Sequence, residues 1–480
     1  MLDFEKKEKI FFYLQDEKKQ GYKGDCIASA LHALGVKKLS SSQRYNRPRG
    51  FFCGIGKCSS CLMRVNGVPN VRTCIAPLKK DIKVEFQDRK EADLPDAEFE
   101  EKPVEKIDVD VLVVGAGPAG LSAGIEAAEN NASVLLVDEN QQIGGQLIKQ
   151  THKFFGSKQE KAGTRGIKIS KILGEKVEQL RDDEKIDLML DATVIGNYET
   201  NDEKFRFGVI KRINYHNRLF EVSCKAVVFA MGAMENMLLF PGNDLPGVYG
   251  AGAVQTLMNV YGVKPGKKVV MVGAGNVGLI VAYQLLQAGI DVECVVEAAS
   301  FIGGYHVHAA KLRRCGVPIF TSHSIKEVYG DGKVEGAVTV KLDGNWNPIE
   351  GTEQDIECDT VCLAVGLTPS IRLLGQTGVR LEDISEAGGQ VAIHDRDMQT
   401  SVDNVFVAGD CSGIEEASTA MIEGKIAGIS AAEKIGYKIK KEKKQKYHKE
   451  LQGLRAGPFG EKPRMAKQKI KKIRKKIEEK

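Results

Sequence analysis

One pattern of strand, glycine turn, helix and strand occurs twice in this 480-residue chain. The first copy reads DVDVLVVGAGPAGLSAGIEAAENNASVLLVDEN from residue 108, and the second reads KKVVMVGAGNVGLIVAYQLLQAGIDVECVVEA from residue 267. In each copy an unbroken apolar run is typical of a parallel strand buried on both faces, and the small residues that follow favour a helix. The corresponding glycines lie 158 residues apart. The repeat therefore predicts an α/β protein built on two β-α-β units.

The first copy places Gly115, Gly117 and Gly120 between its strand and its helix. In such a unit the first glycine allows a tight turn, the second lets a pyrophosphate approach the backbone, and the third lets helix and strand pack closely. The helix N-terminus offers free N–H groups and a partial positive charge to phosphates. Asp138 ends the second strand, where a carboxylate can accept a hydrogen bond from a ribose hydroxyl. These residues favour nucleotide binding, and the alternative is a tight turn with a structural role alone.

The second copy is equally complete. It has Gly273, Gly275 and Gly278, and Glu297 ends its second strand. An acid at this position favours an unphosphorylated 2′-hydroxyl, and therefore NAD over NADP. A degenerate site, or one that holds a different adenine nucleotide, is the alternative.

Two fingerprints in this order resemble the two-dinucleotide flavoproteins, a family similar to glutathione and thioredoxin reductases. The resemblance implies FAD in the first site and a nicotinamide nucleotide in the second, within an inserted domain. Further motifs extend the likeness over residues 108–436: GGQ after the first acid, VVFAMGA at 227–233, DTVCLAVGLTPS at 359–370, and VFVAGD ending at Asp410. It implies that the flavin site includes Gly145, Gln146, Gly232, Gly409 and Asp410.

Those reductases also carry a redox disulfide, either after the first acidic strand or in the second domain. The equivalent stretches here read GGQLIKQTHKFF and CVVEAASFIGG, and neither contains a pair of cysteines. We therefore expect no thiol–disulfide relay, and the electrons of a flavin would need another route.

Four of the eleven cysteines fall within CGIGKCSSCLMRVNGVPNVRTC, namely Cys53, Cys58, Cys61 and Cys74. The first three follow the spacing of plant-type [2Fe–2S] proteins. The glycines between them let a loop wrap a cluster and aim N–H groups at sulfur. Zinc sites usually combine two separated pairs of close cysteines, and only Cys58 and Cys61 are so spaced here. The spacing thus favours a [2Fe–2S] cluster, with zinc and free thiols as alternatives.

The sequence GYKGDCIASALHALGV, followed by RYNRPRGFFCGIGKCSSC, resembles the iron–sulfur module of the sarcosine oxidase alpha subunit family. That group includes electron-transfer subunits of dye-linked proline and hydroxyproline dehydrogenases, hydrogen cyanide synthase and opine oxidases. LLFPGNDLPGVYGAGAVQTLMN at 238–259 is similar to the same group. The resemblance implies a separate FAD-containing catalytic subunit that oxidises an amino or imino acid, such as proline, hydroxyproline, sarcosine or an opine. The sarcosine oxidase alpha module lacks the four cysteines, whereas this chain keeps them.

We expect a small α+β ferredoxin-like [2Fe–2S] domain ahead of two Rossmann-like dinucleotide-binding domains. In the small domain KIFFYLQ predicts a strand, DCIASALHALGV a helix, and LMRV-NG-VPNV a hairpin with an Asn-Gly turn. The expected division is 1–87 for the ferredoxin-like domain, 88–106 for a charged linker, 107–250 and 373–437 for the two parts of the FAD domain, 251–372 for the inserted NAD-type domain, and 438–480 for a basic tail.

Basic charge is concentrated at the C-terminus. Residues 438–480 hold 18 Lys and Arg against 5 Asp and Glu, whereas the preceding residues hold 51 against 59. The body is therefore mildly acidic, and we expect no nucleic-acid partner. The tail places Ile470, Ile473 and Ile477 on one helical face, so it is a solvated basic helix or one that docks on an acidic partner. An anionic membrane surface could also attract it, but the apolar stripe is too thin for a strong anchor.

No stretch approaches the 18 consecutive apolar residues of a membrane-spanning helix. The first residues, MLDFEKKEKIFFYLQ, lack the apolar core and cleavage site of a secretion signal. Cysteines outside the cluster are scattered, which is typical of a reducing cytoplasm. We expect Cys224, Cys294, Cys358 and Cys362 to be buried core thiols. His306 and His308 fit loop or surface positions of the second domain better than a site shared with Cys315.

Together these features predict a flavin-dependent electron-transfer oxidoreductase that works within a hetero-oligomeric amino- or imino-acid dehydrogenase or oxidase. No residue pattern indicates a catalytic triad, a zinc protease or paired catalytic carboxylates. One alternative is a self-sufficient NADH:acceptor oxidoreductase. Another is an assembly subunit that holds a nucleotide only structurally. The sequence leaves the electron acceptor and the direction of electron flow open.

Overall fold

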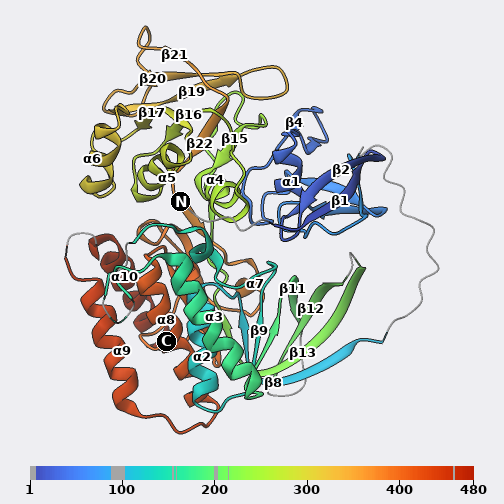
Figure 1. Cartoon of the computed structure of the whole chain (residues 1–480). Helices are drawn as coiled ribbons and strands as arrows, with labels where there is room; N and C mark the ends of the chain where they lie inside the picture. Colours follow the sequence, from blue (N-terminus) through green and yellow to red (C-terminus); the bar gives the residue numbers. More distant parts are fainter. Residues whose placement is uncertain are drawn as a thin grey trace. The chain divides into compact units, whose positions relative to one another are not determined.

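The computed structural model describes residues 7–87, 103–153, 156, 157, 159, 161–198, 204–213, 216–457 and 460–479 (Figure 1). Most of the expected linker at 88–106 lies outside them. The chain forms two compact units: the first joins Met1–Glu98 with Glu235–Gly366, and the second joins Phe99–Met234 with Leu367–Lys480. Strand β15 (Val248–Gly250), which precedes the expected start of the inserted domain at residue 251, pairs with β22 (Thr360–Leu363) in the sheet of the first unit.

The second unit is built on a seven-stranded sheet in the order β10-β9-β8-β13-β12-β11, with β26 also beside β13. The parallel strands are β8 (Glu105–Val114), β9 (Val134–Val137), β10 (Ile186–Met189), the end of β13 (His216–Phe229) and β26 (Val405–Val407). An antiparallel extension contains β11 (Ala192–Tyr198) and β12 (Phe205–Ile213). The fully apolar β9 and the apolar half of β8 are buried on both faces, as their sequences predict.

Helices α2 (Pro118–Glu129), α3 (Gly166–Asp182) and α8 (Ala417–Lys434) belong to this unit (Figure 1). Helices α2 and α8 approach closely because small residues face each other. A Cβ atom added to Gly424 or Gly428 would overlap the carbonyl oxygens of Ala119 and Ala123. This close packing fixes the N-terminal ends of both helices relative to the sheet.

The expected basic tail forms two helices that pack on the second unit, α9 (Lys441–Leu454) and α10 (Glu461–Glu478). Tyr447 and Leu451 of α9 join the core around α2 and α8, while Ala466 and Ile470 of α10 are buried against residues near Val391. Ile473 is partly buried, whereas Ile477 is 38% exposed. The tail is therefore neither a fully solvated helix nor a free docking segment.

The first unit contains the inserted domain and the N-terminal module. The inserted domain has a parallel sheet in the order β15-β22-β16-β17-β18, with β16 (Lys268–Val272), β17 (Asp291–Glu297), β18 (Ile319–Thr321) and β22 (Thr360–Leu363). Its helices include α5 (Asn276–Gln287) and α6 (His306–Arg314), and its second sheet has β19 (His323–Tyr329), β20 (Gly336–Lys341) and β21 (Gln354–Glu357).

The N-terminal module has a five-stranded mixed sheet in the order β2-β1-β7-β5-β6. Its strands are β1 (Lys9–Leu14), β2 (Glu17–Tyr22), β5 (Leu62–Val65), β6 (Val68–Arg72) and β7 (Lys83–Glu85), and its helix is α1 (Ile27–Ala33). The predicted strand, helix and hairpin of this module are confirmed. Asn66 and Gly67 both have positive φ, at 47° and 79°, as a tight hairpin turn requires.

Shorter elements complete the described parts: β3 (Ser40–Ser41), β4 (Pro48–Arg49), η2 (Gly145–Lys149), β14 (Ala233–Glu235), α4 (Ala251–Gln255), η3 (Thr256–Tyr261), β23 (Leu367–Pro369), α7 (Arg372–Gly375), β24 (Leu381–Ile384), η4 (Ser385–Ala387), β25 (Gly389–Ala392) and η5 (Gly409–Ser412). Among the described helices, none combines the length and the apolar character that crossing a bilayer demands.

Candidate functional site

The first glycine fingerprint forms a tight turn between β8 and α2. Gly115 has φ of 104°, and a Cβ atom there would overlap the carbonyl oxygen of Ala230. A Cβ atom on Gly120 would overlap the carbonyl oxygen of Gly115 itself. Both positions therefore admit only glycine, and the helix lies directly against the end of the strand.

Helix α2 begins with no side chain over its N-terminal N–H groups. Gly117 is the N-cap residue and Pro118 follows it. The GGQ turn lies against this end, because a Cβ atom on Gly145 would come within 2.8 Å of the Gly117 Cα. The Gly144 N–H also donates to the Ala116 carbonyl at 2.8 Å. Two glycine backbones thus form one side of a surface that an anionic group can approach closely.

Asp138, directly after β9, forms a hydrogen bond to the glycine turn. Its Oδ2 accepts the Ala116 N–H at 2.7 Å, and its Oδ1 accepts the backbone and side-chain N–H groups of Asn140, both at 2.8 Å. Burial raises the pKa of this carboxyl. A carboxylate oxygen has two acceptor positions, and Oδ2 has used only one of them, so a ribose hydroxyl can still bind there.

The second fingerprint has the same geometry. Cβ atoms on Gly273 and Gly278 would overlap the carbonyl oxygens of Ala364 and Gly273. Glu297 accepts the Ala274 N–H at 2.7 Å through Oε2 and the Ala299 N–H at 2.9 Å through Oε1. Helix α5 starts at the N-cap residue Gly275, again with no capping side chain.

A further glycine turn lies against each fingerprint. A Cβ atom on Gly304 would come within 2.8 Å of the Gly275 carbonyl carbon, as Gly145 approaches Gly117 in the first site. Both turns belong to an Ile-Gly-Gly sequence that begins five residues after the acid, at Ile143 and at Ile302. Gly304 was not among the residues predicted from the sequence, although this spacing repeat marks it.

The turn that ends VFVAGD forms η5, before helix α8. We call this turn the third flavin motif, because the sequence predicts that it lines the flavin site together with the first glycine turn and GGQ. Gly409 has φ of 73°, and its N–H donates to Glu423 Oε2 at 3.0 Å. The half-buried Asp410 accepts the Glu415 N–H at 3.4 Å, and burial raises the pKa of the Asp410 carboxyl to about 7. Gly232 has φ of 66° with open space around it, whereas Gln146 is exposed on η2.

The four cysteines of the N-terminal module lie in and beside one loop. Cys53, Cys61 and Cys74 are each 2% exposed, and Cys58 is half-buried. Side-chain hydrogen bonds from Cys58 and Cys74 lower the pKa of Cys53, and one from Cys74 lowers that of Cys61. The same bonds raise the pKa of Cys58 and Cys74. The four sulfur atoms are thus neighbours that hydrogen-bond to one another, as the ligands of one cluster must be.

Backbone N–H groups point at these sulfur atoms. Those of Ile55 and Lys57 reach Cys53 Sγ at 3.5 and 3.4 Å, and that of Gly56 reaches Cys74 Sγ at 3.3 Å. Gly54 and Gly56 have φ of 63° and 73°, which makes the loop's wrapped conformation accessible. Such N–H···S bonds stabilise the charge of a ligated cluster. The residues therefore fit a [2Fe–2S] group.

In the described part of the chain, no three His, Cys, Asp or Glu side chains gather around a point suited to one metal ion. A [2Fe–2S] cluster divides its four protein ligands between two irons and does not require such a point.

Within the first unit, the cysteine loop packs on the inserted domain. Phe52 and Cys53 share a core with Val248 and Val270, and the Gly250 N–H donates to the Phe52 carbonyl at 3.0 Å. His32 of α1 makes a buried 2.7 Å hydrogen bond to the Tyr249 hydroxyl. The module is therefore seated by both apolar and polar contacts.

The remaining sequence candidates are not ligands of any described cluster. The four expected core thiols are each buried, with exposures of 2% or less. His306 is exposed, as expected, but His308 is buried in helix α6, where its ring lies edge-on to that of Tyr305 with the ring centroids 6.2 Å apart. The surface expectation for His308 was wrong because the stretch begins a helix whose inner face carries this residue. Cys315 is exposed.

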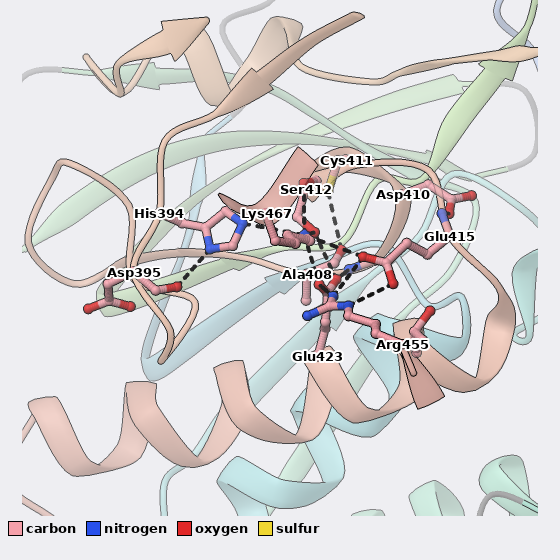
Figure 2. Close-up of polar contacts among 12 residues, drawn as sticks. His394, Asp395, Ala408, Asp410, Cys411, Ser412, Glu415, Glu423, Arg455 and Lys467 are labelled. Atoms are coloured by element: carbon pink, nitrogen blue, oxygen red, sulfur yellow. Dashed lines mark hydrogen bonds and ion pairs between the residues drawn. The ribbon is translucent and has the colours of Figure 1, made fainter. Parts of the chain in front are cut away.

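The partners of the third flavin motif were also not predicted from the sequence. Figure 2 shows Glu423, Arg455 and Lys467 gathered beside Ser412 and Glu415. Arg455 and Lys467 come from the segment treated as a tail. The apolar spacing Tyr447, Leu451 and Leu454 was the available signal that this segment packs.

Two family models match the chain. Residues 109–424, more than half of the chain, match the pyridine nucleotide-disulphide oxidoreductase model, and residues 7–89 match the 2Fe-2S iron-sulfur cluster binding domain. The chain is 25% identical over 458 residues to the sarcosine oxidase alpha chain of Corynebacterium sp. (strain P-1), which covers 90% of this chain and 44% of that protein. It is 30% identical to an opine oxidase subunit of Rhizobium meliloti (strain 1021), covering 69% of this chain and 72% of that protein.

Among solved structures, the crystal structure of L-proline dehydrogenase from P. horikoshii is similar, with a TM-score of 0.72 and 25% identity over 94% of this chain and 78% of that chain. The chain spans less than half the length of the sarcosine oxidase alpha subunits that it matches.

These matches agree with the geometry of the turns and of the cysteine loop. The fold is the predicted one, with Rossmann-type nucleotide-binding domains after a [2Fe–2S] domain. Its cofactors are FAD and a [2Fe–2S] cluster. The chain belongs to the pyridine nucleotide-disulphide oxidoreductase family, in the group that includes the sarcosine oxidase alpha subunits and the related opine oxidase subunits.

Proposed function

We propose that this chain is the electron-transfer subunit of a hetero-oligomeric, FAD-dependent amino- or imino-acid dehydrogenase or oxidase. The observation that carries the proposal is a flavin site without a dithiol in a polypeptide that also has a four-cysteine iron–sulfur loop. Residues 99–234 and 367–480 contain two cysteines, Cys224 and Cys411. Burial raises the pKa of each to about 12, which keeps them as unreactive thiols. A second redox group is therefore needed to take electrons from the flavin, or to deliver them.

The side chains and turns have distinct proposed roles. Gly117, Gly145 and the first turn of α2 bind the FAD pyrophosphate, and Asp138 orients the ribose. Gln146, Gly232, Gly409 and Asp410 line the remainder of the flavin site. Bound FAD exchanges electrons in pairs or singly, and a [2Fe–2S] cluster held by Cys53, Cys58, Cys61 and Cys74 exchanges them one at a time. The loop N–H groups tune the cluster by donating to its ligands.

The partner and the substrate class come from the relatives. Two of them are named as subunits of sarcosine and opine oxidases, and the similar solved structure is of an L-proline dehydrogenase. We infer that a separate FAD-containing subunit oxidises proline, hydroxyproline, sarcosine or an opine, and exchanges electrons with this chain.

The test compares the isolated chain with a complex purified from the native source. We expect the isolated chain to oxidise none of these amino acids, and the complex to reduce a dye with at least one of them. Anaerobic addition of the substrate to the complex should also bleach the absorption of the cluster. Dehydrogenation of proline by the isolated chain would contradict the proposal.

The completeness of the second nucleotide site favours a second candidate, an NADH:acceptor oxidoreductase. Glu297 lies at the end of β17, with its Oε2 on the Ala274 N–H of the glycine turn and its Oε1 on the Ala299 N–H, where an unphosphorylated ribose fits. If this candidate is correct, NADH alone will bleach the flavin rapidly and without oxygen. A Glu297→Ala variant should then require more NADH for the same rate, because the ribose loses an acceptor. No bleaching by NADH would leave the first proposal as the better one.

We also propose a cytoplasmic location. No disulfide joins any of the eleven cysteines, all of which lie in the described part of the chain, although burial and the close approach of buried Cys358 raise the pKa of Cys294. Free thiols persist in reducing compartments. Fractionation of the native cells checks this directly.

A further inference from the structure

Helices α9 and α10 bring two cations onto buried carboxylates (Figure 2). Arg455, the residue directly after α9, makes paired hydrogen bonds to Glu415 at 2.7 and 2.9 Å and a third to Glu423 Oε1 at 2.5 Å. Lys467 of α10 reaches the same Glu423 oxygen at 2.8 Å. The Glu423 side chain is 1% exposed and the two cations are 14–15% exposed. The network is therefore shielded from solvent, and its two acids are balanced by two cations.

The other oxygen of Glu423 holds the third flavin motif. Glu423 Oε2 accepts the Gly409 N–H at 3.0 Å and the Ser412 hydroxyl at 2.7 Å. Lys467 also donates directly to the Ser412 carbonyl at 3.0 Å and to its hydroxyl oxygen at 2.9 Å. Both ends of η5 are thus tied, through Glu423 and Lys467, to the C-terminal helices. Asp410 lies between those two ends.

The stability of this network depends on every charged partner being present. A buried carboxylate is tolerated when cations and N–H groups surround it, and loss of one partner leaves an uncompensated charge. Without Lys467, the Glu423 carboxylate would keep its hydrogen bond from Arg455. It would lose the ammonium group that also donates hydrogen bonds to Ser412. The turn would then be free to shift so that water or another group could satisfy Glu423.

We propose that Arg455 and Lys467 are positioning residues of the FAD site, and that the C-terminal basic helices clamp the Gly409–Ser412 turn in its flavin-binding conformation. This inference rests on the proposed role of Gly409 and Asp410 in binding FAD. It assigns the basic charge of the tail a function within this chain, because two of its cations neutralise carboxylates behind the flavin motif.

The charges also act on Asp410 itself. Burial, followed by the carboxylates of Glu423 and Glu415, raises the pKa of Asp410, and the Lys467 ammonium opposes this rise. Removal of Lys467 therefore makes the Asp410 carboxylate harder to form, in addition to loosening the turn.

The test uses the full chain with Lys467→Met, and Lys469→Met as its matched control. Lys469 lies on the same helix, but it is 52% exposed and pairs with Glu386. FAD affinity is measured by titrating FAD into the cofactor-stripped chain, and the flavin midpoint potential by redox titration. We expect Lys467→Met to bind FAD about tenfold more weakly or worse, the effect of losing a hydrogen bond to a charged group. Its potential should also become more negative, because a cation near the flavin motif is removed.

Two further variants keep the result interpretable if Lys467→Met folds poorly. Lys467→Arg retains the charge and should recover most of the FAD affinity. Glu423→Gln combined with Lys467→Met removes both charges, and should fold as well as the control while still binding FAD weakly. The absorption of the cluster in the N-terminal module reports whether the rest of the chain is intact.

The outcomes separate two failures. Equal FAD affinity and equal potential in Lys467→Met, the double variant and Lys469→Met would overturn the positioning role while leaving the flavoprotein assignment in place. A wild-type chain that binds no FAD at all would overturn the assignment of the site, and this inference with it.

Discussion

At the scale of single residues, the two nucleotide sites depend on glycines that have different tolerances. Gly115 and Gly120 leave no volume for a side chain, since an added Cβ atom would overlap backbone oxygens. Gly124, one turn further along α2, has nothing closer than Val134 at 3.7 Å. The sequence pattern identifies Gly115 and Gly120 as essential. The structure shows that Gly124, in contrast, has room for a side-chain methyl group.

Gly120→Ala should destabilise the chain by about 1–3 kcal/mol, the usual cost of overpacking, and should abolish tight FAD binding. The helix must move away from β8, which spoils the N-terminal surface for the pyrophosphate. Gly124→Ala is the control and should be neutral or stabilising by up to about 1 kcal/mol, because Ala is a better helix former. Denaturant unfolding and FAD content after purification check both. Equal FAD content in the two variants would contradict the predicted role of Gly120.

His394 makes stability depend on pH below about 6.5. It is 6% exposed, and burial together with the Lys467 ammonium lowers its pKa to about 3. An unfolded histidine has a pKa of about 6.5. Because the folded-state pKa is the lower one, the unfolded chain binds more protons between these values. The stabilisation is therefore complete above pH 6.5 and is lost as the pH falls toward 3.

We expect His394 to contribute a slope of up to about 1.4 kcal/mol per pH unit in the free energy of unfolding below pH 6.5. His394→Gln should remove that slope, whereas His306→Gln, at an exposed position, should not change it. Urea unfolding between pH 5 and 7.5 measures both. An unchanged slope in His394→Gln would show that the histidine is protonated in the folded chain.

At the scale of elements, the sequence predicts the strands and turns that follow local or repeated patterns. It does not predict packing between segments that are far apart in the chain. Apolar strands, glycine turns and the Asn-Gly hairpin are local, so their positions follow from residue order. The packing of α10 is not local: Ala466 and Ile470 are buried by residues of β24 and β25, far earlier in the chain. The sequence predicts the helix of the tail but not this packing, because lysine side chains can keep their charges in water while the apolar face of the same helix is buried.

The four cysteines are proposed to hold one cluster, so replacing any one of them should cause loss of the whole cluster. Cys61→Ser removes a ligand whose carbonyl also accepts the Thr73 hydroxyl and N–H beside Cys74. We expect loss of most iron and acid-labile sulfide, and of the visible absorption of the cluster, with FAD content retained. Cys315→Ser, at an exposed position, should leave iron content unchanged. Full iron content in Cys61→Ser would exclude the proposed ligand set.

At the scale of the whole molecule, the charge is divided along the chain. Residues 1–87 hold 17 Lys and Arg against 8 Asp and Glu, whereas residues 88–437 hold 34 against 51. The tail cations that neutralise Glu415 and Glu423 act in the flavin part of the chain. The excess of positive charge on the iron–sulfur module is not used in this way and needs its own explanation. A basic surface raises the local concentration of anionic partners and speeds their association. Lys57, which is exposed, lies next to the half-buried Cys58 in the loop.

The basic module should therefore make electron transfer out of the cluster depend on the charge of the acceptor. With the chain reduced anaerobically, oxidation by ferricyanide should slow as salt is added, because screening weakens its attraction to the module. Oxidation by the cation hexaammineruthenium(III) should speed up over the same range. Lys57→Glu should lower the ferricyanide rate at low salt more than Lys18→Glu does. Lys18 provides the same charge change on β2, at the opposite edge of the sheet from the hairpin that follows the loop. Equal effects of the two variants would mean that the overall charge matters, and that electrons do not leave near Cys58.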